Sequence, residues 1–285
     1  MKTLGYYNGV FGELDKMTVP MLDRAYYFGD GIYDAAYCRN YKIYALREHV
    51  ARFFAGAAAL GLHLPYTEQQ TEYLLQELAR HLDEGDSFVY WQASRGSALR
   101  EHVPPRDLQA NVSVMIVPRK IKPRDTVYRL RSAEDKRHFL CQYKSLSLLA
   151  GVLAAEQAAS AGGDEALLYR LMPDGRKRIT ECAHSNVCAL IDGALVCPPA
   201  DRLILAGVAR QHLMDACREI GVPVREEVLW MEDLLVAQEV LTTASGALCA
   251  RVCEIDGIAV GGKADALPRQ LQTMLYDAYE QATQA

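Results

Sequence analysis

One lysine stands out as a residue that could do chemistry, because it lies where a strand-like segment meets a helix-like one. Lys144 occurs in the segment Cys141–Leu146, just before an apolar stretch. Burial lowers the pKa of a lysine amine, and an uncharged amine is what a Schiff base with a carbonyl group requires. A single lysine is more often a solvated surface charge, so the segment alone leaves both interpretations open.

A carboxylate at Glu181 is the second candidate. It follows the strand-like residues Arg178–Thr180 and precedes the polar loop Cys182–Asn186. Such a carboxylate could pair with a protonated pyridine nitrogen and make a ring cofactor a better electron sink. Taken alone, the residue fits equally a surface glutamate near a turn.

Arg100 and His102 lie in the loop-like segment Arg95–His102. A guanidinium binds a carboxylate bidentately, and a second donor fixes the orientation of that carboxylate. The pair could therefore clamp a substrate carboxylate, and the alternative is a solvated basic loop.

Several segments offer groups that bind phosphate. Gly207–Arg210 opens a predicted helix, whose first N–H groups bind anions, while Thr242–Gly246 supplies hydroxyls and Arg52 supplies charge. Neither Gly-x-Gly-x-x-Gly nor a Walker loop is present, which argues against a nucleotide-binding protein.

Composition narrows the class of function. The chain has 285 residues, of which 50% are hydrophobic, and this suits two packed lobes. Its formal net charge of -5 offers no bulk attraction to nucleic acid or to an anionic membrane. Small-molecule chemistry is the better expectation.

Cysteine usage and the N-terminus indicate a reducing compartment. The eight cysteines include no Cys-x-x-Cys pair, so we expect neither disulfides nor structural zinc, and no other metal. Met1–Gly12 lacks a basic segment followed by an apolar run, and no stretch approaches the roughly 18 apolar residues of a membrane span. We therefore expect a cytoplasmic protein.

The elements that position the candidate residues follow from hydrophobic periodicity and turn residues. Helices are expected over Leu46–Leu60, Thr67–His81, Ser147–Ser160 and about Val208–Ile220. Strands are expected over Tyr6–Phe11, Ile32–Arg39, Lys42–Ala45, Ser87–Ala93, Asn111–Val117, His138–Lys144, Glu165–Arg170, Ser185–Ile191, Ala194–Cys197 and Glu239–Thr243. Asp192-Gly193 predicts a tight hairpin turn.

These elements predict an α/β (α+β) protein with two domains. Pro118–Arg124 is charged and contains two prolines, so we place the interdomain linker at residues 118–126. The expected domains are an N-terminal small α/β domain at 1–117 and a C-terminal large α/β domain at 127–285, which carries Lys144. A small-molecule site is expected between the two lobes.

Taken in order, the motifs resemble the fold-type IV (class IV) aminotransferases that depend on pyridoxal 5'-phosphate, and most closely the D-amino acid aminotransferases. Their joint occurrence across nearly the whole chain is far more specific than any single motif. The matching stretches are Asp23–Tyr33, Glu48–Arg52, Arg95–His102, Tyr143–Leu146, Thr180–Asn186 and Thr242–Thr243.

The resemblance implies a role for each candidate. Lys144 would form the Schiff base with pyridoxal 5'-phosphate and move the α-proton, while Glu181 would pair with the pyridine nitrogen. The remaining assignments divide by ligand group. The phosphate would be held by Arg52, the backbone of Val208 and Ala209, and Thr243, and the substrate carboxylate by Tyr33, Arg100 and His102.

The resemblance also implies a homodimer, in which Arg100 and His102 reach in from the partner subunit. Three positions depart from the family pattern. Tyr37 stands where D-amino acid members commonly have lysine and branched-chain members often have arginine, Ala209 replaces a usual phosphate-binding threonine, and His184 lies in a loop usually rich in serine and threonine. Tyr37 is therefore a further candidate that affects substrate range.

The expected reaction transfers the amino group of a D-amino acid, of the D-alanine or D-glutamate type, to a 2-oxo acid such as 2-oxoglutarate in two half-reactions. Alternatives on the same fold are a branched-chain L-amino acid aminotransferase, an (R)-amine transaminase and an aminodeoxychorismate lyase. Arg100-x-His102 favours the first reaction, because simple amines have no carboxylate to clamp. A non-catalytic binding protein is a further alternative, but binding alone requires neither Lys144 nor Glu181.

Overall fold

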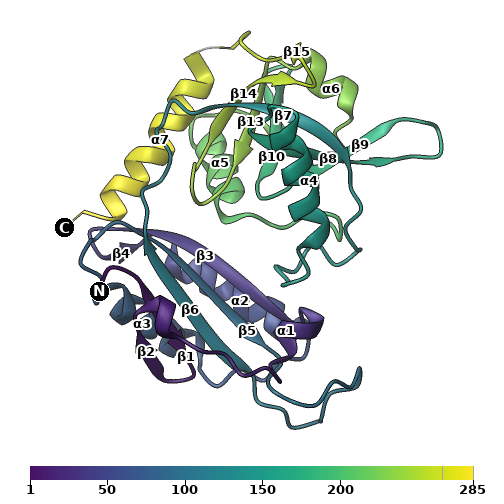
Figure 1. Cartoon of the computed structure of the whole chain (residues 1–285). Coiled ribbons are helices and arrows are strands. Elements are labelled where there is room, and N and C mark those ends of the chain that lie inside the picture. Colours follow the sequence, from purple (N-terminus) through teal and green to yellow (C-terminus); the bar gives the residue numbers. More distant parts are fainter. Residues whose placement is uncertain (265, 285) are drawn as a thin grey trace. The chain divides into compact units, whose positions relative to one another are not determined.

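The computed structural model describes residues 1–264 and 266–284, and the chain divides into two compact units. The first unit consists of Met1–Ile121, Tyr143–Ser147 and the C-terminal residues from Tyr279 onward. The second consists of Lys122–Gln142 and Leu148–Ala278. Each unit combines helices with a β-sheet, which confirms the expected α/β (α+β) class (Figure 1).

The first unit is built on a six-stranded antiparallel sheet in the order β2-β1-β6-β5-β3-β4. Helices α2 (Leu46–Ala59) and α3 (Glu68–Ala79) cover one face of this sheet (Figure 1). Two short helices, η1 (Leu14–Lys16) and α1 (Arg24–Phe28), precede β3. The strands are β1 (Leu4–Tyr7), β2 (Val10–Gly12), β3 (Gly31–Arg39), β4 (Lys42–Ile43), β5 (Ser87–Ser94) and β6 (Asn111–Pro118).

Strand β3 shows why this sheet has two different faces. Asp34, Ala36 and Cys38 are buried, whereas the alternating residues Tyr33 and Tyr37 are only half-buried. Successive side chains of a strand point to opposite faces, so the buried set faces the core beneath α2 and α3. The tyrosines lie on the other face.

The second unit is built on a nine-stranded mixed sheet, in the order β12-β11-β10-β13-β14-β7-β8-β9 with β15 paired to β14. Helix α4 (Leu149–Ser160) packs on β7 and β8, and α5 (Val208–Glu219) packs on β12 and β13. The other helices are α6 (Met231–Val236) and α7 (Ala266–Ala282). The strands are β7 (Val127–Glu134), β8 (Glu165–Leu171), β9 (Lys177–Cys182), β10 (Asn186–Ile191), β11 (Ala194–Cys197), β12 (Val224–Glu226), β13 (Glu239–Thr243), β14 (Ala250–Ile255) and β15 (Ile258–Ala259).

Two turns show how local sequence sets the hairpins. Asp192 and Gly193 join β10 to β11 with φ values of 49° and 73°, which confirms the tight turn expected there. The prediction of one strand over Tyr6–Phe11 is wrong. Asn8 and Gly9 adopt positive φ values of 45° and 94° and split the segment into the β1–β2 hairpin.

The prediction of a strand over His138–Lys144 is also wrong. Backbone groups of this segment form hydrogen bonds with nearby side chains instead of with a neighbouring strand. The Leu140 N–H donates to His138 Nδ1 at 3.1 Å, and the Cys141 thiol donates to the His138 carbonyl. Side chains that bond nearby backbone groups compete with regular structure. Ser145, just beyond, makes a single bridge to Ile32.

Residues 119–126 form neither helix nor strand, as Pro123 predicts, while Pro118 is the last residue of strand β6. The units differ from the expected domain boundaries in one respect that matters for function: Tyr143–Ser147, the segment containing Lys144, packs within the first unit. We keep the boundaries 1–117, 118–126 and 127–285 as a proposal for the folding domains. No helix in the part of the chain that the structure describes is long and apolar enough to cross a membrane.

Candidate active site

Lys144 is fixed by its backbone against the beginning of β3. Its carbonyl accepts a 2.8 Å hydrogen bond from the Tyr33 N–H, and the Leu146 N–H donates to the Gly31 carbonyl at 3.0 Å. A Cβ at Gly31 would lie 2.3 Å from the Ala93 carbonyl oxygen as well as 2.8 Å from Leu146 Cδ1, so this position requires glycine. Lys144 Nζ lies 4.4 Å from the centre of the Tyr33 ring. The structure therefore brings these two predicted site residues together.

Arg52 is held by a buried carboxylate that the sequence analysis did not identify. Asp34 is fully buried, and it accepts hydrogen bonds from Arg52 Nε at 2.9 Å and Nη2 at 2.8 Å. His49 Nδ1 lies 2.8 Å from the same carboxylate. Burial would raise the pKa of Asp34, but the charge of Arg52 and the bonds from His49 and Arg52 hold that pKa well below its usual range. The ionised carboxylate fixes the guanidinium, and a fixed guanidinium is suited to an anion such as phosphate.

Tyr33 and Tyr37 occupy one face of β3. The Tyr33 ring stacks on Tyr90 with centroids 5.4 Å apart, and the Tyr37 ring lies 5.3 Å from Phe88. Four residues of strand separate the two tyrosines by roughly 13 Å. Tyr33 is therefore beside Lys144, and Tyr37 is further along the sheet.

Arg100 and His102 both contact the side chain of Phe28. The Arg100 guanidinium carbon is 4.9 Å from the centre of the Phe28 ring, and the His102 ring is 5.1 Å from it. Both residues are exposed, in the loop between β5 and β6. Within this chain the structure groups Arg100 with His102, and Tyr33 with Lys144.

Glu181 is buried at the end of β9 and fixed by three donors. Its Oε2 accepts from Asn186 Nδ2 at 2.9 Å and from the Leu205 N–H at 3.1 Å, and its Oε1 accepts from Arg137 Nη1. Arg137 also binds Asp135 through Nε and Nη2. The carboxylate is thus held in one orientation, as recognition of a cationic ring N–H requires.

Val208 and Ala209 are the first residues of α5, whose initial N–H groups have no partner within the helix. Gly207 precedes them, and a Cβ there would lie 2.0 Å from Asn186 Oδ1. Asn186 pairs in register with Thr243 on the neighbouring strand. The beginning of α5 and Thr243 are therefore both adjacent to the residue that supports Glu181.

The Thr243 hydroxyl oxygen is buried and makes no hydrogen bond among the described residues. An unpaired buried hydroxyl is costly, and a phosphate beside a helix N-terminus is the kind of ligand that would pair it. Glu181, the beginning of α5 and Thr243 thus fit a molecule that carries a protonated ring nitrogen at one end and a phosphate at the other.

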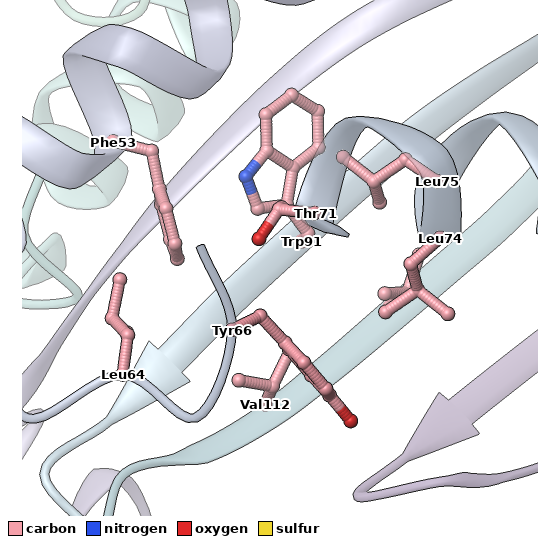
Figure 2. A pocket seen from close by; sticks show the side chains of 9 residues that line it. Phe53, Leu64, Tyr66, Thr71, Leu74, Leu75, Trp91 and Val112 are labelled. Carbon is pink, nitrogen blue, oxygen red and sulfur yellow. The ribbon is translucent and has the colours of Figure 1, made fainter. Parts of the chain in front are cut away.

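A small cavity in the first unit is separate from these residues. Figure 2 shows it between helices α2 and α3 and the sheet, lined mainly by apolar side chains such as Phe53, Leu74 and Trp91. None of its lining residues is a predicted site residue. The cavity belongs to the hydrophobic core.

Asp34, His49, Arg137 and Asn186 support the candidate residues, but the sequence analysis assigned them no role. The sequence contains a signal for the role of Asp34. The residue lies on the core-facing side of a strand with alternating buried and half-buried residues, between Ile32 and Ala36. A charge at such a position requires a buried partner. Arg137 had no such signal, because Glu181, the partner that gives it this role, lies 44 positions away in the sequence.

Comparison with known proteins identifies the family. The model of the amino-transferase class IV family matches residues 31–255. The chain is 33% identical over 265 residues to the D-alanine aminotransferase of Listeria monocytogenes, covering 91% of this chain and 90% of that protein. It is 32% identical over 281 residues to the D-alanine aminotransferase of Bacillus licheniformis, covering 98% and 97%.

Solved structures agree on the fold. The branched-chain aminotransferase of the archaeon Thermoproteus uzoniensis with norvaline superimposes with a TM-score of 0.87 at 20% identity, over 98% of this chain and 94% of that one. A fold IV transaminase from Curtobacterium pusillum gives a TM-score of 0.81 at 22% identity, over 95% and 92%. The family model covers most of the chain and the relatives exceed 30% identity, so this protein belongs to the class IV aminotransferases, which depend on pyridoxal 5'-phosphate.

Proposed function

We propose that this aminotransferase transfers the amino group of a D-amino acid, of the D-alanine or D-glutamate type, to a 2-oxo acid such as 2-oxoglutarate. The observation that carries the proposal is the match to D-alanine aminotransferases over at least nine-tenths of both chains. The branched-chain enzymes among the solved structures are only 20–22% identical and support the fold alone.

The cofactor, when bound, supplies an aldehyde for the amine and a ring that withdraws electrons. We propose that the Lys144 amine holds this aldehyde carbon and then moves the substrate's α-proton. Glu181 orients the ring nitrogen. The phosphate is bound by the guanidinium of Arg52, the N–H groups of Val208 and Ala209, and the Thr243 hydroxyl.

We propose that Tyr33, Arg100 and His102 bind the substrate carboxylate, and that Tyr37 affects which side chains are accepted. The place of the carboxylate sets the hand of the substrate, because Lys144 can take a proton from one face only. A carboxylate held on the side that the family resemblance implies directs the hydrogen of a D-amino acid toward Lys144. An L-amino acid in the same clamp would direct its side chain there.

A homodimer in which two chains share each active site completes the proposal. Helix α4 is apolar over most of its surface, yet Leu149 is 71% exposed, Val152 57% and Leu153 55%. Beside Arg100 and His102, the loop residues Leu99 and Val103 are 74% and 82% exposed. Exposed apolar patches of this kind mark association surfaces, and a second copy of the chain would cover them.

The carboxylate clamp is tested by Arg100→Ala. Losing a partly desolvated arginine contact costs about 2–5 kcal/mol, so kcat/KM for D-alanine should fall by roughly 30- to 5,000-fold. An amine without a carboxylate should be affected much less. Arg106→Ala, an exposed arginine in the same loop, is the matched control and should stay within about twofold of the parent. Unchanged D-alanine kinetics in Arg100→Ala would rule out the clamp.

A further inference from the structure

Arg24 is a buried arginine to which the proposed reaction gives no role. It begins helix α1, and only 2% of the residue is exposed. Its Nη1 donates a 2.7 Å hydrogen bond to the Glu101 carbonyl, and its Nη2 donates one of 3.4 Å to the His102 carbonyl. A buried guanidinium is costly unless its donors are paired. Arg24 therefore fixes the main chain of the loop at the residues that follow Arg100.

The third nitrogen of the Arg24 guanidinium, Nε, donates a hydrogen bond to Asp30 at 2.8 Å. Asp30 also accepts from Arg95 Nε at 2.9 Å, but the other donors of Arg95 bind the carbonyls of Leu60 and Gly61. Burial would raise the pKa of Asp30, and the bonds and charges of Arg95 and Arg24 lower it below its usual value. Two arginine side chains thus share one carboxylate, but of the two only that of Arg24 bonds the loop backbone at Glu101 and His102.

The ring of Phe28, in the same short helix, contacts the side chains of Arg24, Arg100 and His102. The guanidinium carbons of Arg24 and Arg100 each lie 4.9 Å from the ring centre, and the His102 ring lies 5.1 Å from it. Gly29 ends the helix in the left-handed conformation, with φ at 61°, directly after Phe28. The helix therefore contacts the loop twice, through the backbone and through the side chains of Arg100 and His102.

The first part of the loop is attached to the same segment. The Arg24 N–H donates to the Gly96 carbonyl at 2.9 Å, and the Tyr27 hydroxyl donates to the Ala98 carbonyl at 2.5 Å. Residues on both sides of Arg100 are therefore anchored, although Arg100 itself is exposed. Anchoring reduces the number of conformations that an exposed side chain must lose on binding a ligand.

We propose that Arg24 and Phe28 are positioning residues for substrate recognition: Arg24 fixes the loop backbone, Phe28 orients Arg100 and His102, and together they set the affinity for the substrate carboxylate. This inference rests on the proposed function of Arg100 and His102. It adds a specificity role for helix α1, whose residues do not act on the reacting atoms.

The test is steady-state kinetics of the holoenzyme with D-alanine and 2-oxoglutarate. Arg24→Met should raise the KM for D-alanine roughly tenfold and change kcat less than about twofold. The variant loses binding energy that is the same in the ground state and the transition state, so the rate of the chemical step is unaffected. Arg95→Met is the matched control, since it removes an equivalent partner of Asp30 but no hydrogen bond to the backbone at Glu101 and His102, and its KM should match the parent. Arg24→Lys should not rescue the KM, because one ammonium cannot bond Asp30 and both carbonyls.

Two further variants keep the inference falsifiable if Arg24→Met folds poorly. Phe28→Leu leaves every buried charge paired and should also raise the KM for D-alanine. The double variant Arg24→Met/Arg100→Ala should have a KM within about twofold of Arg100→Ala alone, since Arg24 acts through Arg100.

The outcomes separate this inference from the proposed function. An unchanged KM in both Arg24→Met and Phe28→Leu, or an equal rise in Arg95→Met, overturns the positioning role. If Arg100→Ala raises the KM and those two variants do not, only the inference about helix α1 is wrong. If Arg100→Ala leaves the KM unchanged, the clamp and the positioning role are both wrong.

Discussion

The buried hydroxyl of a single residue, Thr243, lowers the stability of the protein without its cofactor. Its oxygen is buried without a hydrogen-bond partner among the described residues, and such a group destabilises a protein by about 1–3 kcal/mol. A site that binds phosphate accepts this cost, because the hydroxyl is paired only when the ligand is present. With the proposed role of Thr243 as a phosphate ligand, the same side chain has opposite effects on the stability of the apoprotein and on its affinity for the cofactor.

Thr243→Val should show these opposite effects. The change keeps the shape of the side chain and removes the hydroxyl, so the melting temperature of the apoprotein should stay the same or rise. Affinity for pyridoxal 5'-phosphate should fall by roughly 5- to 30-fold, equivalent to about 1–2 kcal/mol. Thermal denaturation and cofactor titration of the apoprotein measure the two quantities.

Thr71→Val is the matched control for this prediction. The Thr71 hydroxyl is partnered, donating to the Thr67 carbonyl at 3.0 Å. Its loss should destabilise the apoprotein by about 1 kcal/mol and leave cofactor affinity unchanged. An apoprotein made less stable by Thr243→Val, with no loss of affinity, would show that the hydroxyl is structural.

Sequence reasoning can propose roles for residues whose chemistry depends on their type, and it misses those whose role depends on a distant partner. Lys144 and Glu181 could be selected because an amine and a carboxylate beside predicted strands suggest particular reactions. Arg137 binds both Asp135 and Glu181, which lies 44 positions away in the chain. Only the folded chain shows that the three residues form one cluster.

At the scale of elements, the N-terminus of α5 depends on one glycine. Gly207 has an ordinary backbone conformation, with φ at -72°, so strain does not explain the residue. Lack of space explains the glycine, because a Cβ would lie 2.0 Å from Asn186 Oδ1 and overlap with it. The close approach brings the first N–H groups of α5 beside the amide that supports Glu181.

Gly207→Ala should therefore weaken cofactor binding. Asn186 would have to move and withdraw its bond from Glu181, and a hydrogen bond to a charged group contributes about 1.5–3 kcal/mol, so affinity for pyridoxal 5'-phosphate should fall at least roughly tenfold. Gly56→Ala is the control, since a Cβ there would lie 3.9 Å from Ile32, an ordinary van der Waals contact. That variant should bind the cofactor normally and gain about 0.5–1 kcal/mol of stability. Equal affinities in the two variants would contradict the account of this helix end.

Elements with strong periodicity could be predicted, and those governed by side-chain bonds or by long-range pairing could not. The expected β3, α2 and α3 appear with ends shifted by only a few residues. Strand β7 was missed although Tyr128 and Leu130 alternate with arginines. It pairs with β8 and β14, and such parallel pairings join segments that are distant in sequence.

At the scale of the whole molecule, sequence order is a poor guide to which unit carries a residue. Lys144 follows the expected linker, yet its segment packs within the first unit through Gly31 and Tyr33. These contacts span more than a hundred positions and have no local signal. The two-domain α/β class was nevertheless predictable, because it depends only on the kinds of elements present.

The proposed sharing of active sites between the two chains of a dimer leads to a prediction about mixed subunits. Lys144→Ala and Arg100→Ala should each be nearly inactive toward D-alanine as separate proteins. After subunit exchange, half of the dimers contain one of each chain and one intact site, so activity should return to about a quarter of the parent value. Native mass spectrometry confirms the exchange. Absence of recovery after confirmed exchange would place Arg100 in the site of its own chain.

We propose that the enzyme acts on D-amino acids, and single-turnover absorbance tests this proposal most directly. The holoenzyme is mixed with D-alanine or L-leucine in the absence of a 2-oxo acid, and the decay of the visible absorbance of the bound cofactor is followed. Decay should be at least about tenfold faster with D-alanine, equivalent to about 1.4 kcal/mol of barrier. Equal or faster decay with L-leucine would contradict the assignment.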